Sequence, residues 1–119
     1  MDDKIVSLGF FPGQDTHHSG FTTAQFKKID ALFLQAASVK ALTYRAVDCD
    51  FEAGRATYTY YKTEGQSPLL SFVIQRVSPR TLMYEVYKQG KGKIAKSGVF
   101  ELAYEKLQAE IEKLIETSA

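Results

Sequence analysis

The spacing of apolar residues predicts an amphipathic helix over residues 22–38. Its apolar positions recur at steps of three and four, which is the period of one buried helix face. These positions are Phe26, Ile29, Leu32, Phe33 and Ala36. Thr22 and Gln25 have the spacing of a capping box, with Phe21 and Phe26 at the two positions of a hydrophobic staple. The start of this helix is therefore specified locally.

Between residues 41 and 96 the apolar pattern alternates, which predicts an antiparallel meander of at least four strands. β-branched and aromatic residues dominate this stretch, and turn signals recur along it. The turns are expected at Ala53-Gly54, Ser78-Pro79-Arg80 and Gly90-Lys91-Gly92. A short last strand is expected around residues 93–96.

A two-residue turn at Ala53-Gly54 would pair Glu52 with Arg55 and Asp50 with Thr57. Ala-Gly is not a preferred sequence for such a turn, so a register shifted by a residue or more stays open. With this register, one set of side chains forms the core face of the sheet. The set is Val47, Cys49, Phe51, Ala56, Tyr58, Tyr60, Leu70, Phe72, Ile74, Leu82, Tyr84 and Val86.

Two more elements complete the pattern: a strand over residues 4–11 and a helix over residues 99–116. The apolar stripe of the second helix comprises Phe100, Ala103, Tyr104, Leu107, Ile111 and Leu114. Two amphipathic helices around a meander bury their stripes best on one face of the sheet. We therefore expect one two-layer α+β domain over residues 1–119, in the order β-α-β-β-β-β-α. Its layout is similar to that of helix-grip and other small binding folds in architecture alone.

The composition and net charge of the chain argue against several classes of protein. The chain has 119 residues, 45% of them hydrophobic and 24% charged, which is typical of one globular domain. Its net charge is only +1, whereas dedicated nucleic-acid-binding proteins normally carry a large positive charge. One cysteine cannot form an internal disulfide. The residues Met1-Asp2-Asp3-Lys4 include no apolar segment, so we expect no signal peptide, and no run of about 18 apolar residues predicts a membrane span. We expect a cytoplasmic protein without a membrane partner.

The second face of the expected sheet is more apolar than a solvated face requires. The side chains on it are Tyr61, Leu69, Val73, Val77, Met83 and Tyr87. Contiguous apolar patches mark interfaces, where aromatic residues and Met are enriched. We expect this face to bind a protein partner, first of all a second copy of the chain. Strong curling of the sheet or a register error would remove the patch.

A lysine-rich hairpin at residues 88–96 offers an alternative site for a phosphate or a nucleic-acid backbone. Its lysines are Lys88, Lys91, Lys93 and Lys96. Their spacing lacks the frame of a phosphate-binding P-loop. Lysines at a hairpin tip and on an edge strand also prevent edge-to-edge aggregation, and we favour that interpretation.

Neither a group of three acidic residues nor a pair of histidines supplies enough ligands for a metal ion. Asp48, Asp50 and Glu52 supply three carboxylates, whereas calcium takes about six to eight oxygen ligands. His17 and His18 need at least one further ligand to hold zinc, so a metal there stays an open question.

Cys49 is expected to be a buried thiol, because Asp48 and Asp50 disfavour its thiolate. No nucleophile, base and orienting group can be placed together from the sequence, so no catalytic residue, metal or cofactor is assigned. We expect a non-enzymatic protein-binding module of adaptor, chaperone-like or immunity type that forms a homodimer. A small-molecule pocket between the last helix and the sheet is a further alternative, lined by Tyr58, Tyr60, Tyr84 and Tyr104.

Overall fold

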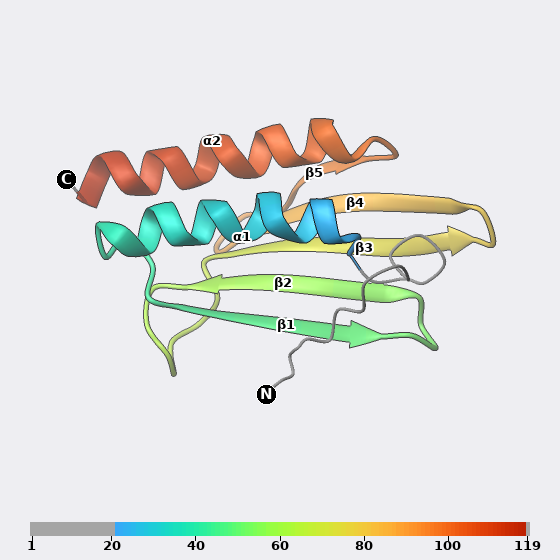
Figure 1. Ribbon diagram of the computed structural model, residues 1–119, viewed down its shortest axis with the longest axis horizontal. Coiled ribbons are helices and arrows are strands. Elements are labelled where there is room, and N and C mark those ends of the chain that lie inside the picture. Colours follow the sequence, from blue (N-terminus) through green and yellow to red (C-terminus); the bar gives the residue numbers. More distant parts are fainter. Residues whose placement is uncertain (1–20, 119) are drawn as a thin grey trace.

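The structure, a computed structural model, describes residues 21–118 (Figure 1). Its elements are α1 (Thr23–Ser38), β1 (Tyr44–Asp50), β2 (Arg55–Tyr61), β3 (Leu70–Ser78), β4 (Thr81–Lys88), β5 (Gly92–Ser97) and α2 (Phe100–Ser118). The strands form one sheet in the order β1-β2-β3-β4-β5, and all neighbours are antiparallel. The α+β class and the meander are confirmed.

The order of elements differs from expectation in one respect. Five strands lie between the two helices, whereas the order β-α-β-β-β-β-α has four there. The difference arises because the short segment from Gly92 to Ser97 pairs with β4 as a full strand. The strand expected at residues 4–11 lies outside the described residues.

The start of α1 confirms the capping box. The Thr22 hydroxyl accepts a hydrogen bond from the Gln25 N–H at 3.0 Å, and the Gln25 side chain accepts one from the Thr22 N–H at 3.1 Å. The helix ends at Ser38, as expected, and Lys40 then turns the chain with a positive φ of 61°.

The turn between β1 and β2 has four residues instead of two, so Asp50 pairs with Arg55 and the expected pairing of Glu52 with Arg55 is wrong. Two-residue hairpin turns need positive φ at one or both central positions, in an order that Ala-Gly does not favour. Within residues 51–54, only Gly54 has a positive φ, at 70°.

This correction shifts the register by two residues, and side chains in a strand alternate with period two. Val47 and Cys49 therefore still lie on the core face, and both pack against the core. Phe51 does not: it lies in the turn and is 55% exposed.

Both helices cover the same face of the sheet. Tyr58, Phe72 and Tyr84 project from that face into the core. The ring of Phe26 on α1 lies 5.8 Å from that of Tyr58, and the ring of Phe100 on α2 lies 5.5 Å from that of Phe72. This confirms the two-layer arrangement.

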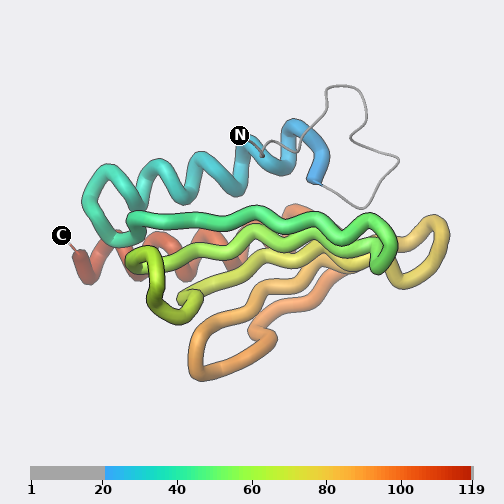
Figure 2. The backbone as a smooth tube through the Cα atoms, turned by 90° about the horizontal axis from the view of Figure 1, so that it is seen from below, coloured from blue at the N-terminus to red at the C-terminus, as the bar shows by residue number. Residues whose placement is uncertain are grey.

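The helices lie side by side and run in the same direction (Figure 1). Near their N-terminal ends, Lys28 of α1 forms a 2.9 Å ion pair with Glu101 of α2. Figure 2 shows the strands following one another in order from β1 to the β4–β5 hairpin. No helix within residues 21–118 is both long and apolar enough to cross a membrane.

Candidate functional site

The face of the sheet turned away from the helices, here called the outer face, carries opposite charges at its two edges. One row of paired residues crosses it from edge to edge: Asp48 on β1, Thr57 on β2, Val73 on β3, Glu85 on β4 and Lys96 on β5. Asp50 extends the acidic edge on β1, and Lys93 extends the basic edge on β5. All four edge residues are exposed.

Three of the six predicted interface residues lie half-buried on the outer face: Tyr61, Met83 and Tyr87. The ring of Tyr61 packs against that of Tyr44, with 5.3 Å between centroids, and Tyr44 is 37% exposed. The aromatic character of this face therefore includes a residue that the sequence analysis did not select.

The other three residues are placed differently. Val73 lies on the outer face but is only 3% exposed, between its ladder partners Thr57 and Glu85. Val77 is 55% exposed, at an irregularity between Arg76 and Ser78 that precedes the β3–β4 turn. The predicted patch is thus smaller and more polar than expected.

Leu69 is not on the outer face but packs against the core. Its N–H donates to the Tyr60 carbonyl, while the next residue, Leu70, is the ladder partner of Tyr60. Leu69 precedes β3, which begins at Leu70, so the alternation of faces within the strand does not decide which way its side chain points.

Glu85 anchors a polar cluster on the outer face although it is only 7% exposed. The Tyr87 hydroxyl donates to it at 2.7 Å, and the Lys93 ammonium lies 3.3 Å from its other oxygen. Burial raises the pKa of the Glu85 carboxyl, but these two hydrogen bonds and the nearby Lys96 outweigh burial and leave the pKa lowered. Glu85 is therefore ionised at neutral pH.

The four lysines of the hairpin at residues 88–96 do not share one face. Lys93 and Lys96 lie on the outer face, and Lys91 is exposed at the hairpin turn. Lys88 points the other way and forms a 2.9 Å ion pair with Glu110 of α2. The expected single anion site is thus divided between two sides of the sheet.

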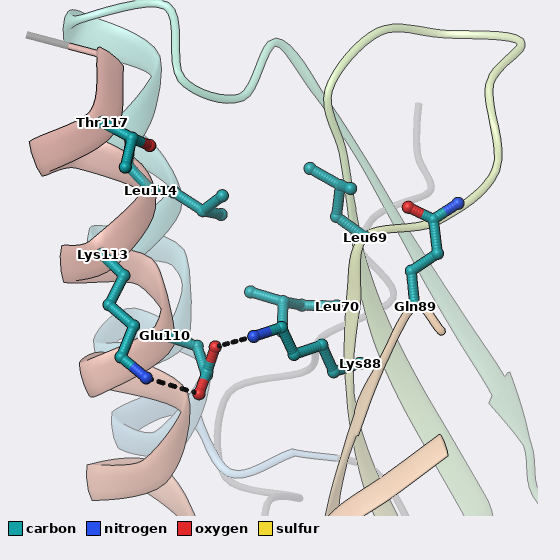
Figure 3. Close-up of a pocket in the computed structure, with 8 residues that line it drawn as sticks. All are labelled: Leu69, Leu70, Lys88, Gln89, Glu110, Lys113, Leu114 and Thr117. Carbon is teal, nitrogen blue, oxygen red and sulfur yellow. Dashed lines mark hydrogen bonds and ion pairs between the residues drawn. The ribbon is translucent and has the colours of Figure 1, made fainter. Parts of the chain in front are cut away.

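A pocket lies on the helix side, between the C-terminal half of α2 and the ends of β3 and β4 (Figure 3). Its volume is about 270 Å³. The lining residues are Leu69, Leu70, Lys88, Gln89, Glu110, Lys113, Leu114 and Thr117.

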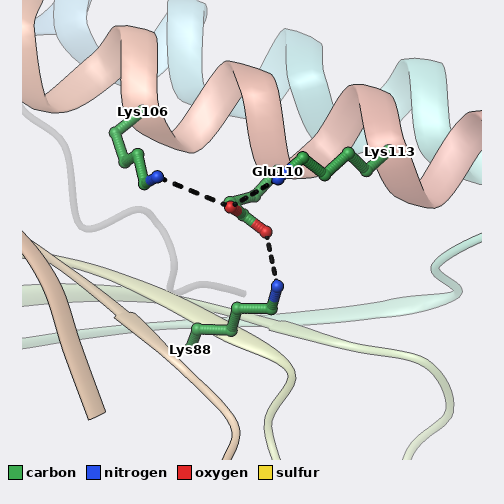
Figure 4. Close-up of polar contacts among 4 residues, drawn as sticks. All are labelled: Lys88, Lys106, Glu110 and Lys113. Carbon is green, nitrogen blue, oxygen red and sulfur yellow. Dashed lines mark hydrogen bonds and ion pairs between the residues drawn. The ribbon is translucent and has the colours of Figure 1, made fainter. Parts of the chain in front are cut away.

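Glu110 is 5% exposed, and three lysine ammonium groups converge on its carboxylate (Figure 4). Lys88 lies at 2.9 Å, Lys113 at 3.4 Å and Lys106 at 3.8 Å. The hydrogen bond from Lys88 lowers the pKa of Glu110 most, burial opposes it, and Lys113 lowers it further. The carboxylate is therefore held in its charged form.

Glu110 was not among the predicted site residues, because a glutamate on an amphipathic helix is normally assigned to the solvated side. A signal was present: Glu110 is three residues after Leu107 and four before Leu114, so it belongs to the apolar stripe of α2. A charged residue inside such a stripe predicts a buried ion pair, but it does not identify the partner.

The expected tyrosine-lined pocket is filled by the core. Tyr58 and Tyr60 have no exposed surface. The Tyr58 hydroxyl donates to the Asp30 carboxylate, and the Tyr60 hydroxyl donates to the Ile29 carbonyl at 2.9 Å. Buried tyrosines with satisfied hydroxyls are structural, so the helix–sheet pocket lies elsewhere, at Glu110.

Cys49 is half-buried and packs against the core. Burial raises the pKa of its thiol, and the neighbouring Asp48 raises it further, so the reactive thiolate is disfavoured. Within residues 21–118, no three His, Cys, Asp or Glu side chains are grouped to hold a metal ion. His17 and His18 lie outside the described residues.

Comparison of the chain with protein-family models, with curated proteins and with solved structures finds no match.

Proposed function

We propose that this chain is a non-enzymatic protein-binding module of adaptor, chaperone-like or immunity type, and that it first binds a second copy of itself through the outer face. One observation carries the proposal. Tyr61, Met83 and Tyr87 lie half-buried between an acidic and a basic edge, and no helix of residues 21–118 covers them. We also propose a cytoplasmic location, where a single half-buried thiol stays reduced.

The edge charges favour one way of stacking two outer faces. A two-fold axis parallel to the strands reverses the strand order, so β1 of one copy lies over β5 of the other. Asp48 then faces the partner's Lys96, because both belong to the row that has Val73 at its centre. An axis perpendicular to the strands would place β1 over β1 and bring like charges together, which is unfavourable.

The size of the face predicts a weak dimer. Five strands about 4.8 Å apart, with about seven residues of 3.3 Å each, cover about 24 by 23 Å. This footprint is close to the lower limit of about 600 Å² per partner for a specific interface. Val73 contributes little to it because Val73 is already buried.

Charge reversal tests both the dimer and its geometry. Asp48→Lys alone and Lys96→Asp alone each put like charges opposite one another at two symmetric places, and we expect each to weaken association about tenfold. The combined variant recreates opposite charges and restores association. The dissociation constant is measured by sedimentation equilibrium over a range of concentrations.

Glu112→Lys is the matched control, since it reverses an exposed acid on α2, on the helix side. It leaves association unchanged if the outer face is the interface. A chain that is monomeric at every concentration would contradict self-association, and single variants without effect would contradict this interface. Val73 is avoided as a probe because a charge at a buried position would unfold the protein.

A further inference from the structure

The pocket beside Glu110 combines leucine side chains with charged groups (Figure 3). The helix α2 contributes Leu114 and Lys113, and the strand side contributes Leu69, Leu70 and Lys88, so leucines and ammonium groups from both sides line the same space. A volume of about 270 Å³ admits a small molecule or a single large side chain. This combination suits a ligand with one charged end and one apolar end.

The charges at this pocket do not balance. Glu110 is the only acid in the lining, and within the described residues it is the only acidic partner of Lys88, Lys106 and Lys113. Two lysines and one carboxylate in the lining leave an excess of one positive charge there, and Lys106 pairs with the same carboxylate from outside the lining. An ammonium group has three donors, and each of these lysines uses only part of that capacity on the carboxylate.

Glu110 is buried, whereas Lys113, which also lines the pocket, has a side chain that is 64% exposed. Its ammonium lies at a loose 3.4 Å from Glu110, so it can turn toward a second anion without leaving the pocket. The side chain of Gln89 lines the same space and adds a neutral donor, whereas the Thr117 hydroxyl, which also lines it, donates to the Leu114 carbonyl at 3.1 Å.

We propose that this pocket binds a carboxylate that carries a short, branched apolar group. The carboxylate pairs with Lys113 and Lys88, and the apolar group packs against Leu69, Leu70 and Leu114. Such a group occurs on a free branched-chain acid and at the C-terminus of a peptide that ends in leucine. The pocket lies on the helix side, so this proposal is independent of self-association through the outer face.

The test is a titration of the ¹⁵N-labelled protein followed by amide chemical shifts. The probes are 4-methylpentanoate and, as its neutral counterpart, 4-methylpentan-1-ol. We expect the acid alone to give saturable shifts at Leu69, Gln89, Leu114 and Thr117. Equal binding of the alcohol would overturn the role of the charges, and an absence of saturable shifts with the acid would overturn the site.

Two substitutions are expected to act in opposite directions. Lys113→Gln weakens binding of the acid about tenfold by removing one charge-assisted hydrogen bond. Glu110→Gln tightens it, because the competing carboxylate is gone. Lys27→Gln, at an exposed position on α1, is the control and changes nothing. Since Lys113 is exposed, its variant is expected to fold, and an unchanged affinity in it would contradict the proposal.

Peptides distinguish the two sources of the ligand. A short peptide ending in leucine with a free carboxylate is compared with the same peptide carrying a C-terminal amide. Tighter binding of the free peptide than of 4-methylpentanoate identifies a chain terminus as the ligand, and binding of the acid alone identifies a small molecule. Binding of the amide as tight as that of the free peptide would contradict carboxylate recognition.

Discussion

Glu110 and Lys88 form a 2.9 Å ion pair that joins α2 to β4 at the border of the hydrophobic core. Glu110 is 5% exposed and lies next to Ile111, which has no exposed surface. A buried charge is costly unless it is paired and hydrogen-bonded, and Glu110 meets this requirement with three lysines. The contact is therefore sensitive to the protonation of one carboxyl group.

Acid is expected to weaken the fold through Glu110. Its pKa is lowered in the folded protein, so its contribution to the free energy of unfolding is complete above the unfolded-state value of about 4.3. The contribution is lost as the pH falls through the lowered folded-state value. Urea unfolding between about pH 6 and about pH 3 measures this loss.

In Glu110→Gln the free energy of unfolding should fall less steeply over that range, because the variant has no carboxyl group to protonate at this position. Glu112→Gln, at an exposed position of the same helix, is the control and keeps the original slope. Glu85 has a lowered pKa as well and contributes acid sensitivity both to the unmodified protein and to the variant. Identical pH dependence in Glu110→Gln and the unmodified protein would refute this assignment.

The two buried tyrosine hydroxyls should contribute unequally to stability. The Tyr58 hydroxyl donates to the charged Asp30, which also pairs with Arg45 at 2.9 Å, and the Tyr60 hydroxyl donates to the neutral Ile29 carbonyl. Hydrogen bonds to charged groups are worth more, so we expect Tyr58→Phe to cost about 2 kcal/mol and Tyr60→Phe about 1 kcal/mol. Urea unfolding at neutral pH measures both, and a larger cost at Tyr60 would contradict this ranking.

Cys49 should react slowly with alkylating reagents at neutral pH. Burial and the charge of Asp48 raise the pKa of its thiol, which reduces the thiolate fraction. We expect iodoacetamide to react more slowly with Cys49 than with a free thiol, and the rate to increase as the pH rises. Asp48→Asn, which removes the adjacent charge, accelerates the reaction at neutral pH. Fast alkylation of the folded protein at neutral pH would show that the thiol is activated.

Local interactions explain which features could be predicted from the sequence. The capping box of Thr22 and Gln25 joins residues three positions apart, so it depends on nothing outside the first turn of α1. The core face of the sheet follows from alternation, and this is why Tyr58, Phe72 and Tyr84 were placed correctly despite a register error. A two-residue shift leaves every side chain that stays within a strand on its original face, and Phe51, which moved into the turn, is the exception.

Features that depend on contacts between distant segments could not be predicted from the sequence in the same way. Leu69 lies in the bend before β3 and packs against the core, and burial beside Thr57 and Glu85 removed Val73 from the predicted patch. Lys88 lies on the same face of β4 as Tyr84 and Val86, apart from Lys93 and Lys96, and there it meets Glu110 of α2. Residue 88 and residue 110 are far apart in sequence, and only the packing of α2 on the sheet brings their charges together.

The sequence by itself determined the two helices, the meander and the choice of faces, because periodicity and capping act over a few neighbouring residues. Only the tertiary structure decided the strand register, the pocket at Glu110 and the row from Asp48 to Lys96, because each requires strands or helices to be aligned across the whole domain. That alignment depends on the packing of the whole core, so no single segment of the sequence determines it.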